Sequence, residues 1–294
     1  MSLVVAVVLG LVQALTEFLP VSSTAHLLVF GELLGQSLSD ERFRAFVTII
    51  QSGTTIAVVV YFREELWRLT SAALAGIARG RPLESRDARL AWLIVLGTIP
   101  AAVAGKLLER RIEALGNLTI AFSLVLWGLI LLAAERLARH RRTVDDVGVG
   151  DAAIIGVGQA MALVPGVSRS GATITTGMAV GLRREDAARF SFLLSVPIML
   201  GAGAYKLGKV LPLLRGHQSW VVATVVATAV ALVAGYGVIG WLLAYLRTRT
   251  TYLFVVWRIA AGILIAVLLW RGVLPNGDEA HPPPAPAARA ASVP

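Results

Sequence analysis

The sequence lacks cysteine altogether and carries little charge, since Asp, Glu, Lys and Arg together make up only 15% of its 294 residues. The absence of cysteine excludes a disulfide scaffold and any metal site built from thiolates. An ordinary soluble domain has about a quarter of its residues charged, whereas 56% of this chain is hydrophobic before glycine is counted. The chain has too little polar surface to cover itself in water, which predicts a membrane protein.

Long apolar segments alternate with short arginine-rich connections. Six segments approach the length of about 20 residues that a helix needs to cross a bilayer, namely 43–62, 90–106, 118–135, 190–211, 220–246 and 252–270. The formal net charge of +9 lies mostly in the connections, so it indicates orientation in the membrane and argues against nucleic acid as a partner. These features predict an all-α polytopic membrane protein.

Two further apolar regions, 3–36 and 152–182, are interrupted by LPVSSTAH and VPGVSRSG. A broken backbone is tolerated at membrane depth only where it faces protein or a wet cavity. Each region is therefore expected to form a re-entrant hairpin of two short helices.

The two broken regions lie about 145 residues apart, and the segments that follow them correspond as well. The matched positions are Pro20, Ser22 and Phe46 in the first half and Pro165, Ser168 and Phe190 in the second. Each half is then one re-entrant hairpin plus three transmembrane helices, which gives an inverted-topology repeat. We expect one transmembrane domain over 1–271, with repeats of about 1–137 and 151–271 and a site where the two breaks meet at the midplane.

The connections also predict the orientation. More Lys and Arg fall on the side that holds the 63–89 and 136–142 connections, so we expect that side to face the cytoplasm and both termini to lie outside. The stretch 79–89 is expected to be a solvated turn. Residues 272–294 are rich in Pro and Ala, which predicts a disordered tail.

Glu17 is the first residue that does not fit the apolar background. A carboxylate at membrane depth costs on the order of 3 kcal/mol unless it is paired or hydrated, and Glu17 is followed by a Ser-Ser-Thr cluster and His26. His26 could transfer protons or attack phosphorus, and Ser23 could be a nucleophile or a ligand. Gln13 lies one helical turn before Glu17 and is either a weak metal ligand or a packed amide.

Arg169 is the second misfit, because PGVSRSG places it between two serines at the break of the second hairpin. Gly166 allows close approach of the backbone, free N–H groups there form an anion-binding nest, and the guanidinium offers a planar fork to phosphate oxygens. An acid and a histidine facing this nest suit a substrate with a phosphate head and an apolar tail. A carboxylate commonly holds a divalent metal in such reactions, which makes Glu17 the expected ligand.

Gln51 and Arg258 are also polar residues within apolar segments, but their surroundings in the sequence indicate a function less clearly. Gln51 is expected to contact the first hairpin, or it forms a hydrogen bond between helices. Arg258 is either a snorkelling or an interhelical arginine. The expected substrate-binding set is Ser22, Thr24, Gln51, Gly166, Ser168, Ser170 and Thr173.

The motifs resemble those of the bacterial undecaprenyl-diphosphatase family of the bacitracin-resistance type. QALTEFLPVSSTAHL at 13–27 is similar to that family's (E/Q)xxxE segment and the Ser and His after it. ALVPGVSRSGATITTG at 162–177 is similar to its PGxSRSxxT segment, and RFSFLLSVP at 189–197 is also typical of the family. The resemblance covers the chain apart from its C-terminal tail.

The resemblance implies an integral phosphatase of the bacterial inner membrane that converts undecaprenyl diphosphate to undecaprenyl phosphate. It would recycle the lipid carrier of peptidoglycan synthesis, give bacitracin resistance, use a divalent cation (Mg or Ca) and open toward the periplasm. Glu17, Ser23, His26 and Arg169 are then the catalytic set, with Glu17 and Gln13 as metal ligands. Gln13 occupies the first acidic position of the motif and leaves Glu17 as the single carboxylate of the segment QALTEFLPVSSTAHL at 13–27.

Two alternatives stay open from the sequence. Either Ser23 attacks phosphorus while His26 acts as acid and base, or His26 attacks while Ser23 is a ligand. The same anion site would also suit a transporter or flippase of a lipid phosphate or another anion, since inverted repeats with broken helices are common in transporters. The sequence does not distinguish a monomer from a homodimer.

Overall fold

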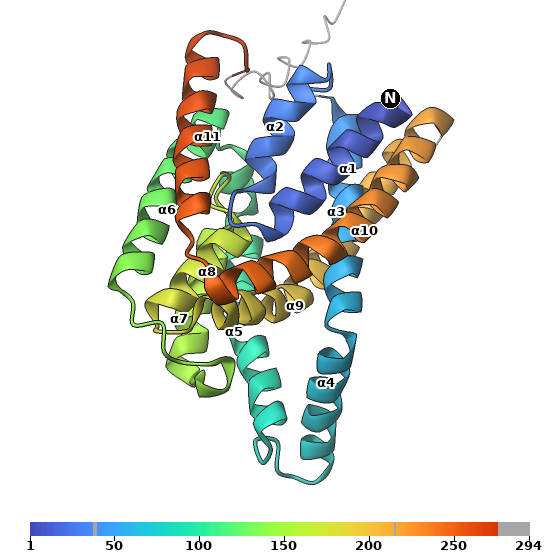
Figure 1. Cartoon of the computed structure of the whole chain (residues 1–294). Helices are drawn as coiled ribbons and strands as arrows, with labels where there is room; N and C mark the ends of the chain where they lie inside the picture. Colours follow the sequence, from blue (N-terminus) through green and yellow to red (C-terminus); the bar gives the residue numbers. More distant parts are fainter. Residues whose placement is uncertain (38–39, 215, 276–294) are drawn as a thin grey trace, which may run out of the picture.

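The protein is described from a computed structural model that covers residues 1–37, 40–214 and 216–275. Within these ranges the chain forms eleven α-helices and two short 3-10 helices (Figure 1). The α-helices are α1 (Leu3–Phe18), α2 (Ser23–Leu33), α3 (Glu41–Tyr61), α4 (Arg63–Ala78), α5 (Arg86–Glu113), α6 (Asn117–Leu137), α7 (Val149–Met161), α8 (Arg169–Ala179), α9 (Arg184–Val210), α10 (Gln218–Thr248) and α11 (Tyr252–Trp270). The 3-10 helices are η1 (Val144–Asp146) and η2 (Leu211–Leu214).

Six helices are long and apolar enough to cross a membrane, in agreement with the six predicted segments. They are α3, α5, α6, α9, α10 and α11, and in each one's most apolar stretch between 22% and 56% of the residues are buried inside the protein. Many of their exposed residues are large and apolar, such as Phe122, Val225 and Ile263, as expected for helices that contact lipid. The chain is an all-α polytopic membrane protein.

The connection between the first two long helices differs from the sequence prediction. The region 63–89 was expected to be a loop, but its first part forms α4, with only Phe62 between α3 and α4. Glu64 and Glu65 in the first turn favour the start of this helix, because acidic groups stabilise a helix N-terminus. The sequence did not predict α4, because the segment contains too many polar residues for a membrane-spanning helix. The turn predicted at 79–89 is present over 79–85, but residues 86–89 are already helical because α5 begins at Arg86.

Both interrupted apolar regions consist of two short helices with a break between them. The break after α1 covers 19–22 and the break after α7 covers 162–168. Each ends in a serine with a positive φ, 75° at Ser22 and 72° at Ser168, a conformation that few residues other than glycine adopt. In Figure 1 the end of α1 and the start of α8 meet in the interior of the helix bundle.

Buried aromatic rings fix the end of α1 against α9. Phe18 is fully buried and meets the ring of Phe192 edge-on, with 5.6 Å between ring centroids. Phe62 packs on Phe192 as well, so α1, α3 and α9 share this contact. Packing of this kind sets the position of Glu17, the residue just before Phe18.

A buried ion pair joins the far ends of three long helices. Glu135 of α6 accepts hydrogen bonds from the guanidinium of Arg184 on α9 and from the hydroxyl of Thr251, which precedes α11. Glu135 is 5% exposed, so the carboxylate needs these donors. The pair therefore holds the ends of α6, α9 and α11 together.

The described residues include the first part of the predicted tail. Leu274 is buried beside Ala25 and Ile265, and Asn117 Nδ2 donates a hydrogen bond to the carbonyl of Pro275 at 2.7 Å. The prediction of disorder for 276–294 lies outside the described residues.

Candidate functional site

Glu17 lies at the end of α1, where Pro20 cannot continue the helix because it has no N–H to donate. Glu17 is 7% exposed, and its Oε2 accepts hydrogen bonds from Ser23 Oγ at 2.9 Å and from Gln13 Nε2 at 3.2 Å. The structure thus places Gln13 on the same helical face as Glu17, as predicted. Ser23 is the first residue of α2, so the break brings it back to the carboxylate.

Arg169 is the first residue of α8 and reaches Glu17 from the second break. Its Nη2 lies 3.0 Å from Glu17 Oε1, and the two side chains are 14% and 6% exposed. Nη2 also lies 3.2 Å from Met199 Sδ on α9. Nη1 is buried and has no hydrogen-bond partner among the described residues. Arg169 therefore pairs with Glu17 through Nη2 and can still donate from Nη1 to a further acceptor.

The backbone before Arg169 can be formed only with glycine. Gly166 has φ of +90°, and a Cβ there would lie 2.5 Å from the carbonyl oxygen of Ile120 on α6. Ser168 then caps α8 by accepting a hydrogen bond from Gly171 N at 3.1 Å. Close contact with α6 therefore fixes the position of the first turn of α8.

Two hydroxyls predicted to bind substrate instead connect protein segments. Ser170 Oγ donates to the carbonyls of Glu17 and Leu19 at 3.1 and 3.0 Å, which joins the start of α8 to the end of α1. Thr173 Oγ1 lies 2.5 Å from Ser191 Oγ on α9. Both Ser170 and Thr173 are fully buried, so in this structure their hydroxyls hold α8 against its neighbours.

His26 does not contact Glu17 or Arg169 in this structure. Its Nδ1 lies 2.8 Å from the carbonyl oxygen of Ser22, and its Nε2 accepts a hydrogen bond from Trp257 Nε1 at 2.8 Å. Ser22 is buried and makes no side-chain capping bond, whereas Thr24 is exposed. The ring of His26 therefore faces α11 and not the carboxylate.

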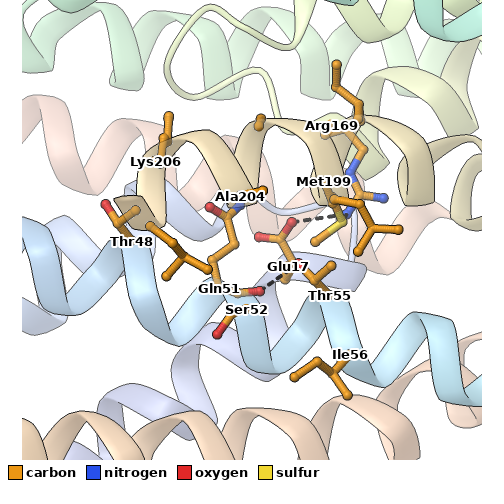
Figure 2. Close-up of a pocket in the computed structure, with 15 residues that line it drawn as sticks. Glu17, Thr48, Gln51, Ser52, Thr55, Ile56, Arg169, Met199, Ala204 and Lys206 are labelled. Atoms are coloured by element: carbon orange, nitrogen blue, oxygen red, sulfur yellow. Dashed lines mark hydrogen bonds and ion pairs between the residues drawn. The ribbon is translucent and has the colours of Figure 1, made fainter. Parts of the chain in front are cut away.

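A cavity of about 390 Å³ opens beside the Glu17–Arg169 pair, between α3 and α9. Figure 2 shows the pair joined by a dashed line, with Gln51 and Thr55 of α3 next to it. Gln51 is exposed and lines this cavity together with Glu17 of the first hairpin. Lys206 of α9 also lines the cavity and was missed, because a lysine near a helix end is indistinguishable from an orienting charge.

Arg258 of α11 is fully buried and binds both breaks. Its Nη1 donates to the carbonyl of Pro20 at 3.0 Å, and its Nη2 donates to the carbonyls of Gly166 and Val167 at 3.1 and 2.9 Å. The snorkelling interpretation is therefore wrong, and the interhelical one is confirmed. Because Pro20 and Gly166 belong to different breaks, Arg258 holds the two breaks in register.

The site offers a divalent cation few of the oxygen ligands that such an ion prefers. The described residues contain no group of three or more His, Asp or Glu that could hold a metal alone. Glu17 is the carboxylate of the site, and Gln13 beside it donates a hydrogen bond to Oε2 through its amide Nε2 at 3.2 Å. Mg²⁺ is usually held by one or two carboxylates together with substrate phosphates, so these residues fit a cation that binds with a phosphate substrate.

Comparisons with known proteins match nearly the whole chain. The family described as bacitracin resistance protein BacA matches residues 6–264. An undecaprenyl-diphosphatase of Anaeromyxobacter sp. (strain Fw109-5) is 69% identical over 292 residues, 99% of this chain and 96% of the relative. Another, of Anaeromyxobacter dehalogenans (strain 2CP-1 / ATCC BAA-258), is 71% identical over 95% of this chain and 96% of its own length. The undecaprenyl-diphosphatase of Myxococcus xanthus (strain DK1622) is 47% identical over 93% of this chain and 91% of the relative.

Proposed function

Since this chain belongs to the bacitracin resistance protein BacA family, we propose that it is an undecaprenyl-diphosphatase. It hydrolyses undecaprenyl diphosphate to undecaprenyl phosphate and inorganic phosphate. This reaction recycles the lipid carrier of peptidoglycan synthesis and gives resistance to bacitracin. The substrate is a lipid with a diphosphate head, which suits a site enclosed by membrane helices.

One observation carries the assignment of the site. Arg169 and Glu17 come from different breaks, lie 3.0 Å apart, and leave Arg169 Nη1 buried without a partner. A buried donor of this kind costs free energy unless an acceptor reaches it. A phosphate oxygen is a suitable acceptor, because guanidinium binds phosphate through two parallel N–H groups.

Ser23 is the nucleophile that the geometry favours over His26. Ser23 Oγ donates a hydrogen bond to Glu17 Oε2 at 2.9 Å, whereas the ring of His26 bonds Ser22 and Trp257 and contacts neither Glu17 nor Arg169. Ser23 Oγ forms a bond to the terminal phosphorus, Glu17 takes the hydroxyl proton, and the bond from that phosphorus to the bridging oxygen breaks. Undecaprenyl phosphate leaves with the bridging oxygen, and water then cleaves the phosphoserine.

The remaining site residues bind and neutralise the diphosphate. Arg169 holds the phosphate oxygens on which negative charge is spread during the transfer. A divalent cation, Mg²⁺ or Ca²⁺, held by Glu17, Gln13 and the diphosphate would neutralise further charge on the phosphates. Gln51 lines the same cavity and is placed to donate a hydrogen bond to the head group.

We also propose that the fold is an inverted repeat. The first-half helices α1 and α3 both pack on α10 of the second half, and the second-half helices α7 and α9 both pack on α5 of the first half. The helices α6 and α11 pack on each other, as related elements beside a pseudo-two-fold axis do. The matching serines with positive φ, Ser22 and Ser168, support this relation. In this arrangement α1–α2 and α7–α8 are the re-entrant hairpins, and α4 is an addition to the first half.

The cavity opens toward the periplasm in this proposal. The connections at 63–89 and 136–142 carry the greater number of Lys and Arg, which favours a cytoplasmic location for them. The cavity lies toward the ends of α3 and α9 that are remote from these connections. It is lined there by Thr48, near the start of α3, and by Lys206, near the end of α9. The apolar residues Ile56, Ile198 and Leu200 line it as well, which lets the lipid tail remain in the membrane.

Transport of a lipid phosphate stays a prediction without a specific observation in its favour. A transporter needs the anion site but does not require a serine hydroxyl that is hydrogen-bonded to a carboxylate. Hydrolysis uses both groups, so it accounts for more of the site.

The test is release of inorganic phosphate from undecaprenyl diphosphate by the purified chain in lipid nanodiscs. We expect release in the presence of Mg²⁺ or Ca²⁺ and loss of release in Glu17→Gln and Arg169→Met. Arg63→Gln serves as the matched control, because Arg63 is exposed and its partners among the described residues are Glu64 and the carbonyl of Val60. Absence of release with either cation would contradict the assignment.

A further inference from the structure

The ring nitrogens of His26 are held by groups from two different helices. On one side, the carbonyl of Ser22 lies 2.8 Å from Nδ1. On the other side, the indole of Trp257 on α11 donates to Nε2 at 2.8 Å. The two rings are nearly parallel, with an angle of 9° between their planes and 5.9 Å between their centroids.

These partners determine where the proton of the imidazole lies. A carbonyl oxygen only accepts, so Nδ1 must carry hydrogen to bond Ser22. An indole nitrogen only donates, so Nε2 must present its lone pair to Trp257. His26 is therefore the neutral tautomer with hydrogen on Nδ1, and Nε2 is the nitrogen that can accept a proton.

Among the described residues that line the cavity around His26, Trp257 is the one with a side-chain hydrogen-bond donor. The two rings line a cavity of about 380 Å³ between α2 and α11, and every other described residue lining it is apolar, including Val29, Phe30 and Leu264. Trp257 is 53% exposed, so its position is not set by burial in the core. Without the indole N–H, the lone pair of Nε2 would face apolar groups.

We propose that Trp257 is a positioning residue that holds His26 with Nε2 unprotonated, ready to act as a base. This inference rests on the proposed function, in which phospho-Ser23 must be hydrolysed. Ser23 lies three residues before His26 on α2, so the two residues are neighbours on the surface of that helix. Water attacks the phosphorus, the bond from phosphorus to Oγ breaks, and Nε2 takes the proton that the water loses once the indole gives way. Glu17 returns its proton to Ser23 Oγ, and the proton on Nε2 then leaves with the product phosphate.

Nitrogen NMR tests the tautomer without reference to catalysis. The full chain, labelled with ¹⁵N-histidine in nanodiscs, is compared with His26→Asn to identify the resonances of His26. We expect one protonated and one unprotonated ring nitrogen in the wild type, with the unprotonated signal shifted in Trp257→Phe, which keeps an aromatic ring but removes the N–H. Trp270→Phe on the same helix is the control, because Trp270 is 80% exposed and its recorded ring contact is with Arg271.

The spectra also separate this effect from misfolding. Unchanged resonances of His140 and His217 in Trp257→Phe show that the fold is retained. A His26 protonated on Nε2 in the wild type, or the same His26 spectrum in Trp257→Phe as in the wild type, overturns the proposal.

Kinetics then test whether Trp257 acts through His26. Loss of a residue that orients a reacting group typically costs about 10-fold or more, so we expect kcat of Trp257→Phe to fall by about that factor with KM little changed. In the His26→Asn background the same substitution should have no further effect. An equal loss of kcat in that background overturns the proposal. If the wild type releases no phosphate at all, the proposed function fails, while the NMR comparison still decides the role of Trp257 in holding His26.

Discussion

Breaking the Glu17–Arg169 pair from one side should destabilise the protein much more than removing both charges. The two side chains are 6% and 14% exposed and lie 3.0 Å apart. At an effective dielectric constant of about 20, charges at that distance attract by about 5 kcal/mol, most of which desolvation offsets. Removing one partner leaves a buried charge and costs about 3–5 kcal/mol, whereas replacing both is close to neutral.

The prediction is tested by thermal unfolding of Glu17→Gln, Arg169→Met and the double variant in one detergent. For a protein of this size each kcal/mol lowers the melting temperature by about 2–4 °C, so we expect Glu17→Gln, which leaves the guanidinium unpaired, to melt about 6–20 °C lower. The double variant should recover most of the loss. Glu64→Gln, in an exposed pair with Arg63, should leave the melting temperature unchanged. If the falls in melting temperature of the two single variants simply add in the double variant, the reasoning is refuted, because the two charges then do not interact.

Three further substitutions and one chelation test other parts of the site. Ser23→Ala should lower phosphate release by about 10³-fold or more and abolish a phosphoenzyme trapped from ³²P-labelled diphosphate; trapping of label in this variant would exclude Ser23. Arg258→Lys should cost about 1–3 kcal/mol of stability, measured by melting, because an ammonium cannot reach every carbonyl that the guanidinium binds; wild-type melting would show that those bonds contribute nothing. Gly166→Ala should cost about 2–3 kcal/mol because its Cβ would meet the carbonyl of Ile120, whereas Gly80→Ala, which also has positive φ but no atom within 4 Å, should cost less. Removal of divalent cations with EDTA should stop phosphate release, and addition of Mg²⁺ or Ca²⁺ should restore it; full activity in EDTA would rule out the cation.

The long helices could be predicted from sequence because a bilayer imposes their length. Each apolar run of about 20 residues has one stable structure in lipid, and all six predicted runs are helices. The positions of the two breaks could also be predicted from the sequence, because clusters of Pro, Gly and Ser do not continue a helix inside a membrane. The helix α4 was missed because it is short and polar and packs through few residues, such as Leu69, so neither length nor composition distinguished it from a loop.

The meeting of Glu17 with Arg169 followed from the two motifs, whereas the surroundings of His26 did not. The hydrogen bond from Trp257 to His26 joins residues 231 positions apart. Nothing local distinguishes this tryptophan from one anchored at a membrane interface. The role of Arg258 was open for the same reason, since its acceptors are backbone carbonyls and backbone carbonyls leave no pattern in a sequence. Contacts made through the backbone or over long separations require the folded chain.

The two breaks are alike in backbone and unlike in side chains, and this difference is what lets them form one site. Both end in a serine with positive φ, and both supply carbonyls to Arg258. The hydrogen bonds to Arg258 pair backbone carbonyls of both breaks, and an unpaired backbone group costs free energy wherever it occurs inside a membrane. The first residue of the following helix differs, being Ser23 in one half and Arg169 in the other. A hydroxyl and a cation, on the first residues of α2 and α8, therefore bond to different oxygens of the same Glu17 carboxylate, which two identical breaks could not achieve.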